Sequence, residues 1–126
     1  MSSLPCEFFP IHGKISHKFS VFYSIKNGVT TVFDHHASFG HIEGSLQMIE
    51  EASKDLGVRT CLCYEISDRD GMEKSRESVM ENVNFIRHVR EDDSDMLAAM
   101  MGMHASFTIS DETMALCREL KPEGVG

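Results

Sequence analysis

The stretch VRTCLCYEISDRDG, residues 58–71, begins as an apolar, strand-like run and ends in a cluster of ionisable residues. The stretches VTTVFDHHAS, residues 29–38, and MLAAMMGMHASFTIS, residues 96–110, repeat this pattern. Short apolar runs bounded by turn residues are typical of buried strands, which we expect over residues 29–33, 58–66 and about 97–103. Because α/β enzymes place their chemistry at the carboxyl ends of parallel strands, the three polar clusters are the expected functional residues.

Helical patterns lie between the three strand-like runs. Apolar residues recur at steps of four, three, three and four from Ile42 to Leu56, with Gly57 in the capping position. A second apolar stripe follows the turn at Asp70 and Gly71. Its members are Val79, Val83, Ile86 and Val89 or Arg90.

Two shorter helices are expected outside this central part. One runs from about Lys18 to Asn27, and Gly28 supplies its left-handed cap. The other follows Ser110, a good N-cap with acidic residues in the first turn after it, and ends near Leu120.

The order of these elements predicts one α/β domain. Residues 1–18 show no periodicity and are expected to form an irregular leader, whereas residues 19–126 form the domain. The strand starts are roughly 29 and 39 residues apart, which is the length of βα units. Right-handed crossovers would make the strands parallel and cover the sheet with helices. Two architectures satisfy this pattern, a small open sheet and a partial (β/α)8 barrel of about three βα units.

The composition is ordinary for a globular domain and argues against two classes of partner. The chain has 126 residues, of which 41% are hydrophobic and 25% charged, and its formal net charge is -8. No clustered Lys/Arg surface is visible for nucleic acid, and no apolar stretch approaches the roughly 20 residues that span a bilayer. We therefore expect a cytoplasmic protein with reduced cysteines and with neither nucleic-acid nor membrane partners.

Strand alternation predicts which polar side chains share a face. One face of the central run carries Cys61, Cys63 and Glu65, and the other carries Leu62, Tyr64 and Ile66, which should face the helices. This places Glu65 at the polar mouth of the sheet. In the first run, Asp34 and His36 share a face, so the adjacent His35 and His36 should not chelate one metal together.

A histidine ends the third run. His104 lies two residues after Gly102, and a neutral imidazole there could bind a substrate or act as an acid or base near pH 7. Structural alternatives stay open, because Glu65 could simply pair with Arg69, and His36 could be a buried structural residue. The candidate substrate-binding residues are His104, Glu65 and His36, and no catalytic residue or metal ligand is assigned.

Three strings resemble the middle of proteins in the amidohydrolase superfamily, chlorohydrolase and aminohydrolase branch. They are SIKNGVTTVFDHHASFGHIEGSL, GVRTCLCYEISDRDG and MMGMHASFTISDETMALC, and the resemblance covers about residues 24–126. It implies a (β/α)8 hydrolase in which a divalent metal, zinc or iron, activates water for attack on a non-peptide C–N bond of a small heterocyclic substrate. It also implies a substrate contact for His104. The metal-ligand positions of the family match no residue in this sequence, so no metal is expected for this chain alone.

Three hypotheses follow. The first is a fragment with the second to fourth βα units of such an enzyme, inactive alone. The second is a non-enzymatic remnant or interaction module that associates through its open sheet edges, with another copy or another chain. The third is a self-contained small α/β domain with a site built from Asp34, His36, Glu65 and His104.

Overall fold

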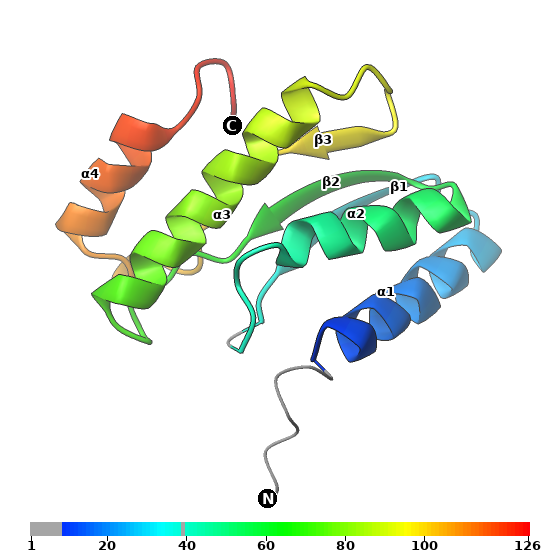
Figure 1. Ribbon diagram of the computed structural model, residues 1–126, viewed down its shortest axis with the longest axis horizontal. Helices are drawn as coiled ribbons and strands as arrows, with labels where there is room; N and C mark the ends of the chain where they lie inside the picture. Colours follow the sequence, from blue (N-terminus) through cyan, green and yellow to red (C-terminus); the bar gives the residue numbers. More distant parts are fainter. Residues whose placement is uncertain (1–8, 39) are drawn as a thin grey trace, which may run out of the picture.

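A computed structural model describes residues 9–38 and 40–126 (Figure 1). In chain order its elements are α1 (Phe9–Lys26), β1 (Thr31–His36), α2 (Ser45–Leu56), β2 (Arg59–Tyr64), α3 (Met72–Arg90), β3 (Leu97–Ala99), the 3-10 helix η1 (Ser106–Thr108) and α4 (Asp111–Leu120). Helices and strands alternate, which confirms the predicted order. No helix in the described ranges is both long and apolar enough to cross a membrane.

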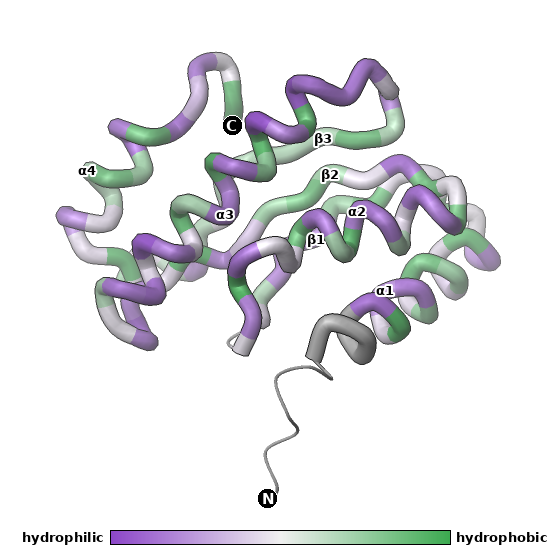
Figure 2. Tube along the Cα trace, viewed as in Figure 1, coloured by the Kyte–Doolittle hydropathy of each residue, from purple (hydrophilic) through white to green (hydrophobic). Residues whose placement is uncertain are grey.

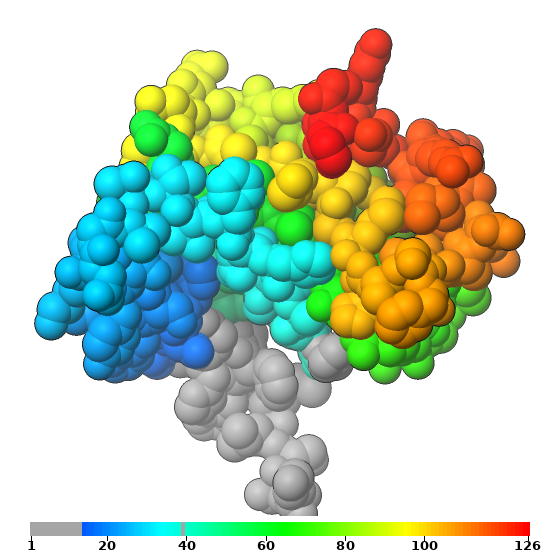
Figure 3. All heavy atoms as spheres, turned by 180° about the vertical axis from the view of Figure 1, so that it is seen from behind, coloured from blue at the N-terminus to red at the C-terminus, as the bar shows by residue number. Residues whose placement is uncertain are grey.

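The three strands form one parallel sheet in the order β1-β2-β3. Helices α2 and α3 cover one face of this sheet, α1 lies beside α2, and α4 lies beside α3 (Figure 1). Seen from behind, atoms of the strands lie between those of α1 and α4 with no helix over them (Figure 3). The fold is therefore a mixed α/β layer of consecutive parallel βα units, as predicted.

Two apolar clusters join the helices to the sheet. The first contains Ile42, Leu46, Ile49, Leu62, Tyr64, Phe85 and Leu97. The second contains Ile66, Val79, Val83, Ile86, Met101 and Cys117. The first cluster includes apolar residues of β2 and β3, strands that are partly green in Figure 2. The predicted stripe of α3 and the helix-facing side of β2 are thus confirmed.

The first helix is longer than predicted. It begins at Phe9 and ends at Lys26, so the prediction of an irregular segment is wrong for residues 9–18, while residues 1–8 lie outside the described residues. Pro10 is tolerated because it lies in the first turn, where a backbone N–H has no helical partner. The predicted cap is confirmed, since Gly28 has a φ of 82°. The division between leader and domain at residue 18 stays a prediction.

The two outer strands differ from their predicted bounds. β1 continues to His36, so Asp34 and both histidines belong to the strand and not to a loop. β3 ends at Ala99, four residues early, although an isolated bridge between Ile66 and Met103 resumes the pairing. The interruption is the place where a side chain from α3 enters the sheet.

Candidate functional site

Four polar side chains meet at the carboxyl end of the sheet, and we call His35, Glu65, Arg69 and His104 the strand-end cluster. Oε1 of Glu65 lies 3.0 Å from Nδ1 of His104 and 2.9 Å from Nη2 of Arg69. Oε2 of Glu65 lies 3.9 Å from Nε2 of His35. The Glu65 side chain is 17% exposed, against 32% for His104 and 45% for His35. The carboxylate is therefore the inner anchor, and the two rings are open to a ligand.

Backbone pairing beyond the strands sets these positions. The N–H of Glu65 donates to the carbonyl of His36 at 2.8 Å, and the N–H of Ile66 donates to the carbonyl of Gly102 at 3.1 Å. The N–H of His104 then donates to the carbonyl of Ile66 at 3.0 Å. Because the ladder continues in this way, the residues after β2 and β3 stay side by side and Glu65 reaches His104.

Gly102 allows the segment that carries His104 to approach β2 closely. A Cβ atom at this position would lie 2.5 Å from the carbonyl oxygen of Tyr64 and 2.9 Å from Sγ of Cys63. Any side chain there would push the two segments apart. Glycine is thus required for the contact between His104 and Glu65.

Asn82 of α3 is the side chain that interrupts β3, and sequence reasoning missed it. It is 1% exposed, its Oδ1 accepts from the N–H of Tyr64 at 2.8 Å and of Gly102 at 3.4 Å, and its Nδ2 donates to the carbonyl of Tyr64 at 2.9 Å. It takes the place of strand pairing and holds the two strand ends together. An asparagine between Val79 and Val83, inside a buried apolar stripe, is the signal that could have revealed it.

The structure separates His36 from the other two candidate residues. His36 is in register with Tyr64, and the two rings meet edge-on with centroids 5.9 Å apart on the helix-covered face. Burial lowers the pKa of His36, although the Asp34 carboxylate opposes this. The hypothesis that grouped Asp34 and His36 with Glu65 and His104 in one site is therefore wrong, because the sheet lies between the two pairs. The histidine that lies near Glu65 is His35, which was not among the three candidates.

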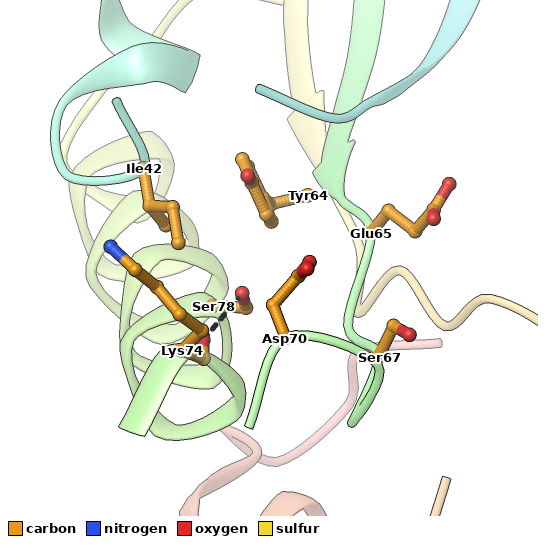
Figure 4. A pocket seen from close by; sticks show the side chains of 7 residues that line it. All are labelled: Ile42, Tyr64, Glu65, Ser67, Asp70, Lys74 and Ser78. Atoms are coloured by element: carbon orange, nitrogen blue, oxygen red, sulfur yellow. Dashed lines mark hydrogen bonds between the residues drawn. The ribbon is translucent and has the colours of Figure 1, made fainter. Parts of the chain in front are cut away.

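A cavity of about 170 Å³ adjoins the cluster on the helix side of the sheet. It is lined by Ile42, Tyr64, Glu65, Ser67, Asp70, Lys74 and Ser78 (Figure 4). Figure 4 shows the Glu65 carboxylate pointing away from Ile42 and Lys74. Glu65 therefore lies between the cavity and the strand-end cluster, and its carboxylate points to the cluster.

Asp68 fixes the loop between β2 and α3. Oδ1 accepts from Oγ of Ser75 at 2.5 Å and from Oγ1 of Thr113 at 2.6 Å, and Oδ2 accepts from the N–H of Ser110 at 2.5 Å. Burial opposes ionisation, but these hydrogen bonds lower the pKa of Asp68 to about 2. The carboxylate thus ties the loop that carries Arg69 to the first turns of α3 and α4.

The described side chains do not fit the divalent metal that the resemblance implies. Within residues 14–38 and 40–126, no group of three His, Cys, Asp or Glu side chains could hold a metal ion. Cys61, Cys63 and Cys117 are free and buried, and burial raises the pKa of Cys63 to about 11, which makes its thiol a poor ligand and nucleophile near pH 7.

Fold and cluster together define an α/β protein with polar, partly exposed side chains at the carboxyl ends of consecutive parallel strands. This edge is where proteins of such folds bind their substrates.

Comparison with known proteins relates the chain to a deaminase. It is similar to 5'-deoxyadenosine deaminase from Methanoregula boonei, with 29% identity over 99 residues, which cover 79% of this chain and 21% of that protein. The chain thus spans about a fifth of the length of the curated relative that it matches. No family model matches the chain. No solved structure matches it. The similarity supports an origin in a hydrolase family that includes deaminases.

Proposed function

We propose that the chain forms part of the substrate-binding wall of a metal-dependent aminohydrolase with a (β/α)8 barrel. The observation that carries the proposal is the Glu65 carboxylate between His35 and His104, at the ends of three consecutive parallel strands. The similarity to a deaminase supports hydrolysis of a C–N bond. The sequence resemblance supports the chlorohydrolase and aminohydrolase branch of the amidohydrolase superfamily, in which SsnA is the protein that the chain resembles.

We assign His104 the role of a ligand contact. Its Nδ1 lies 3.0 Å from a carboxylate oxygen of Glu65, which leaves Nε2 for the substrate. Arg69 balances the charge of the same carboxylate. An amino-bearing heterocycle suits such a site, because its ring nitrogens and amino group offer both acceptors and donors. The metal of the family would supply the activated water, and the described residues do not form a site for that metal. We therefore expect the chain alone to bind a substrate without hydrolysing it.

Titration of the isotope-labelled chain with 5'-deoxyadenosine, followed by amide NMR, tests the proposal. We expect shifts at residues next to Glu65 and His104, and at least a tenfold loss of affinity in His104→Ala. His41→Ala is the matched control, because His41 lies outside the strand-end cluster. Absence of shifts at the cluster would contradict the binding role. Release of ammonia from the chain with added zinc or iron would contradict its inactivity alone.

The second candidate function is an interaction module that associates through its sheet edges. β1 and β3 are the edge strands, and each pairs with β2 alone among the described strands. Unpaired strand edges can accept a strand from another chain. Amide hydrogen exchange tests this: protection of β1 that increases with protein concentration would support edge pairing, and concentration-independent exchange would contradict it.

A further inference from the structure

Helix α1 carries an apolar surface that faces away from the protein. Of the nine exposed large apolar side chains among the described residues, five lie on this helix. Four of them follow helical spacing along one side of the helix. We call Ile15, Phe19, Phe22 and Tyr23 the α1 stripe. Their exposed fractions are 48%, 62%, 49% and 62%. A contiguous apolar surface of this kind is typical of an interaction site.

The opposite side of α1 attaches to the protein mainly through polar contacts. These contacts join Lys14 to Glu51 at 2.9 Å, Lys18 to Asp55 at 2.6 Å and His17 to Ser53 at 3.1 Å. Val21, 1% exposed, is buried there, but neither core cluster includes a residue of α1. The helix thus presents its larger apolar surface to the outside.

A groove between α3 and α4 offers a matching surface. It has a volume of about 440 Å³. Its apolar lining includes Met72, Met80, Leu116 and Leu120. Its charged lining residues are Arg76, Glu112 and Glu119, and because Arg76 pairs with Glu112 at 3.5 Å, one negative charge is left over. We call it the α3/α4 groove; its two helices lie side by side in Figure 1. Methionine-rich grooves accommodate varied apolar side chains, because the thioether chain adapts its shape.

Charge and length are complementary between the two surfaces. Two of the three lysines of α1, Lys14 and Lys18, pair with Glu51 and Asp55 of the same chain, so Lys26 is the lysine that could meet the groove. Lys26 lies beside the stripe, with Nζ 5.6 Å from the centre of the Phe22 ring. The stripe spans eight residue steps from Ile15 to Tyr23, as does the α4 side of the groove from Glu112 to Leu120, so each is about 12 Å long.

We infer that the α1 stripe of one copy of this chain docks into the α3/α4 groove of a second copy. An apolar helix face against an apolar groove is a recurrent mode of recognition, and the net negative charge of the groove lining favours Lys26 beside the stripe. The two surfaces differ, so the contact is heterologous, and each added copy brings a further free stripe and groove. The stripe offers on the order of 400 Å² of apolar surface, which predicts a weak, concentration-dependent association.

Sedimentation equilibrium of the full chain at rising concentration tests this inference. We expect the average mass to rise from the 14.2 kDa of one chain past that of a dimer. Phe19→Ser with Phe22→Ser removes the stripe, and Met80→Lys with Glu119→Lys alters the groove; each double variant should lose at least tenfold in association constant. Phe107→Ser is the matched control, because Phe107 is 89% exposed and lies outside both surfaces. Circular dichroism checks that every variant is folded.

Mixing the two double variants separates this arrangement from other ones. The stripe variant retains its groove and the groove variant retains its stripe, so the mixture should form a 1:1 dimer that grows no further. A wild-type chain that stays monomeric, or groove variants that associate like the wild type, would overturn the inference. Stripe-dependent binding of a monomeric chain to phosphatidylglycerol vesicles would overturn it too, because the stripe would then serve a membrane surface.

Discussion

Replacing Asn82 with alanine tests how the strand ends that carry the cluster are held. The N–H and the carbonyl of Tyr64, a residue 2% exposed, both bond to the Asn82 carboxamide. Each group left without a partner costs about 1–3 kcal/mol, and alanine returns about 0.5 kcal/mol as the better helix former. We therefore expect Asn82→Ala to lower the free energy of unfolding by about 2–5 kcal/mol.

Urea unfolding followed by circular dichroism measures this loss. Asn84→Ala is the matched control, because Asn84 is an exposed asparagine on the same helix, and its free energy of unfolding should change by no more than about 0.5 kcal/mol. A loss below about 1 kcal/mol for Asn82→Ala, or one no larger than that of Asn84→Ala, would refute the idea that Asn82 substitutes for strand pairing.

Three further predictions concern single residues. Gly102→Ala should cost about 1–3 kcal/mol in urea unfolding and weaken the NMR contact between His104 and Glu65, since its Cβ would lie 2.5 Å from a backbone oxygen; unchanged stability would refute the close approach. The pKa of Asp68 is lowered to about 2, so the stability that this carboxylate contributes is present above pH 4 and lost as pH falls towards 2. In Asp68→Asn, the urea midpoint should therefore depend less on pH over this range, and the same pH dependence as in the wild type would count against the prediction. Burial lowers the pKa of His36, so stability should fall as pH drops from 7 to 5, and His36→Phe should reduce that fall; an equal fall in both proteins would contradict this.

The central strand shows what the sequence can predict. In β2, Leu62 and Tyr64 alternate with smaller residues, and the larger side chains pack on the helices as expected. The sequence of β1, TVFDHH, has apolar and ionisable residues on both faces, so alternation shows which residues share a face but not which face the helices cover. Phe33 is 72% exposed on the open face of the sheet. By alternation His35 lies on the same face, near Glu65, and His36 lies on the face that the helices cover.

Other features depend on contacts between distant parts of the chain. The early start of α1 was hidden because Pro10 and Gly13 are helix breakers in most positions, and because the polar side of this helix, with His17, faces inward. The early end of β3 depends on Asn82, a residue of α3. Local patterns cannot specify either feature, since the partner that stabilises it lies far away in the sequence.

The hydrogen bonds of Asp68 join three separate segments. The loop with Arg69 and the first turns of α3 and α4 all bond to this carboxylate, and hydrogen bonds to a charged group contribute about 1.5–3 kcal/mol each. None of the three segments can shift alone without losing such a bond. A single proton on Asp68 would therefore loosen the strand-end cluster and the α3/α4 groove at the same time, although the two surfaces share no residue.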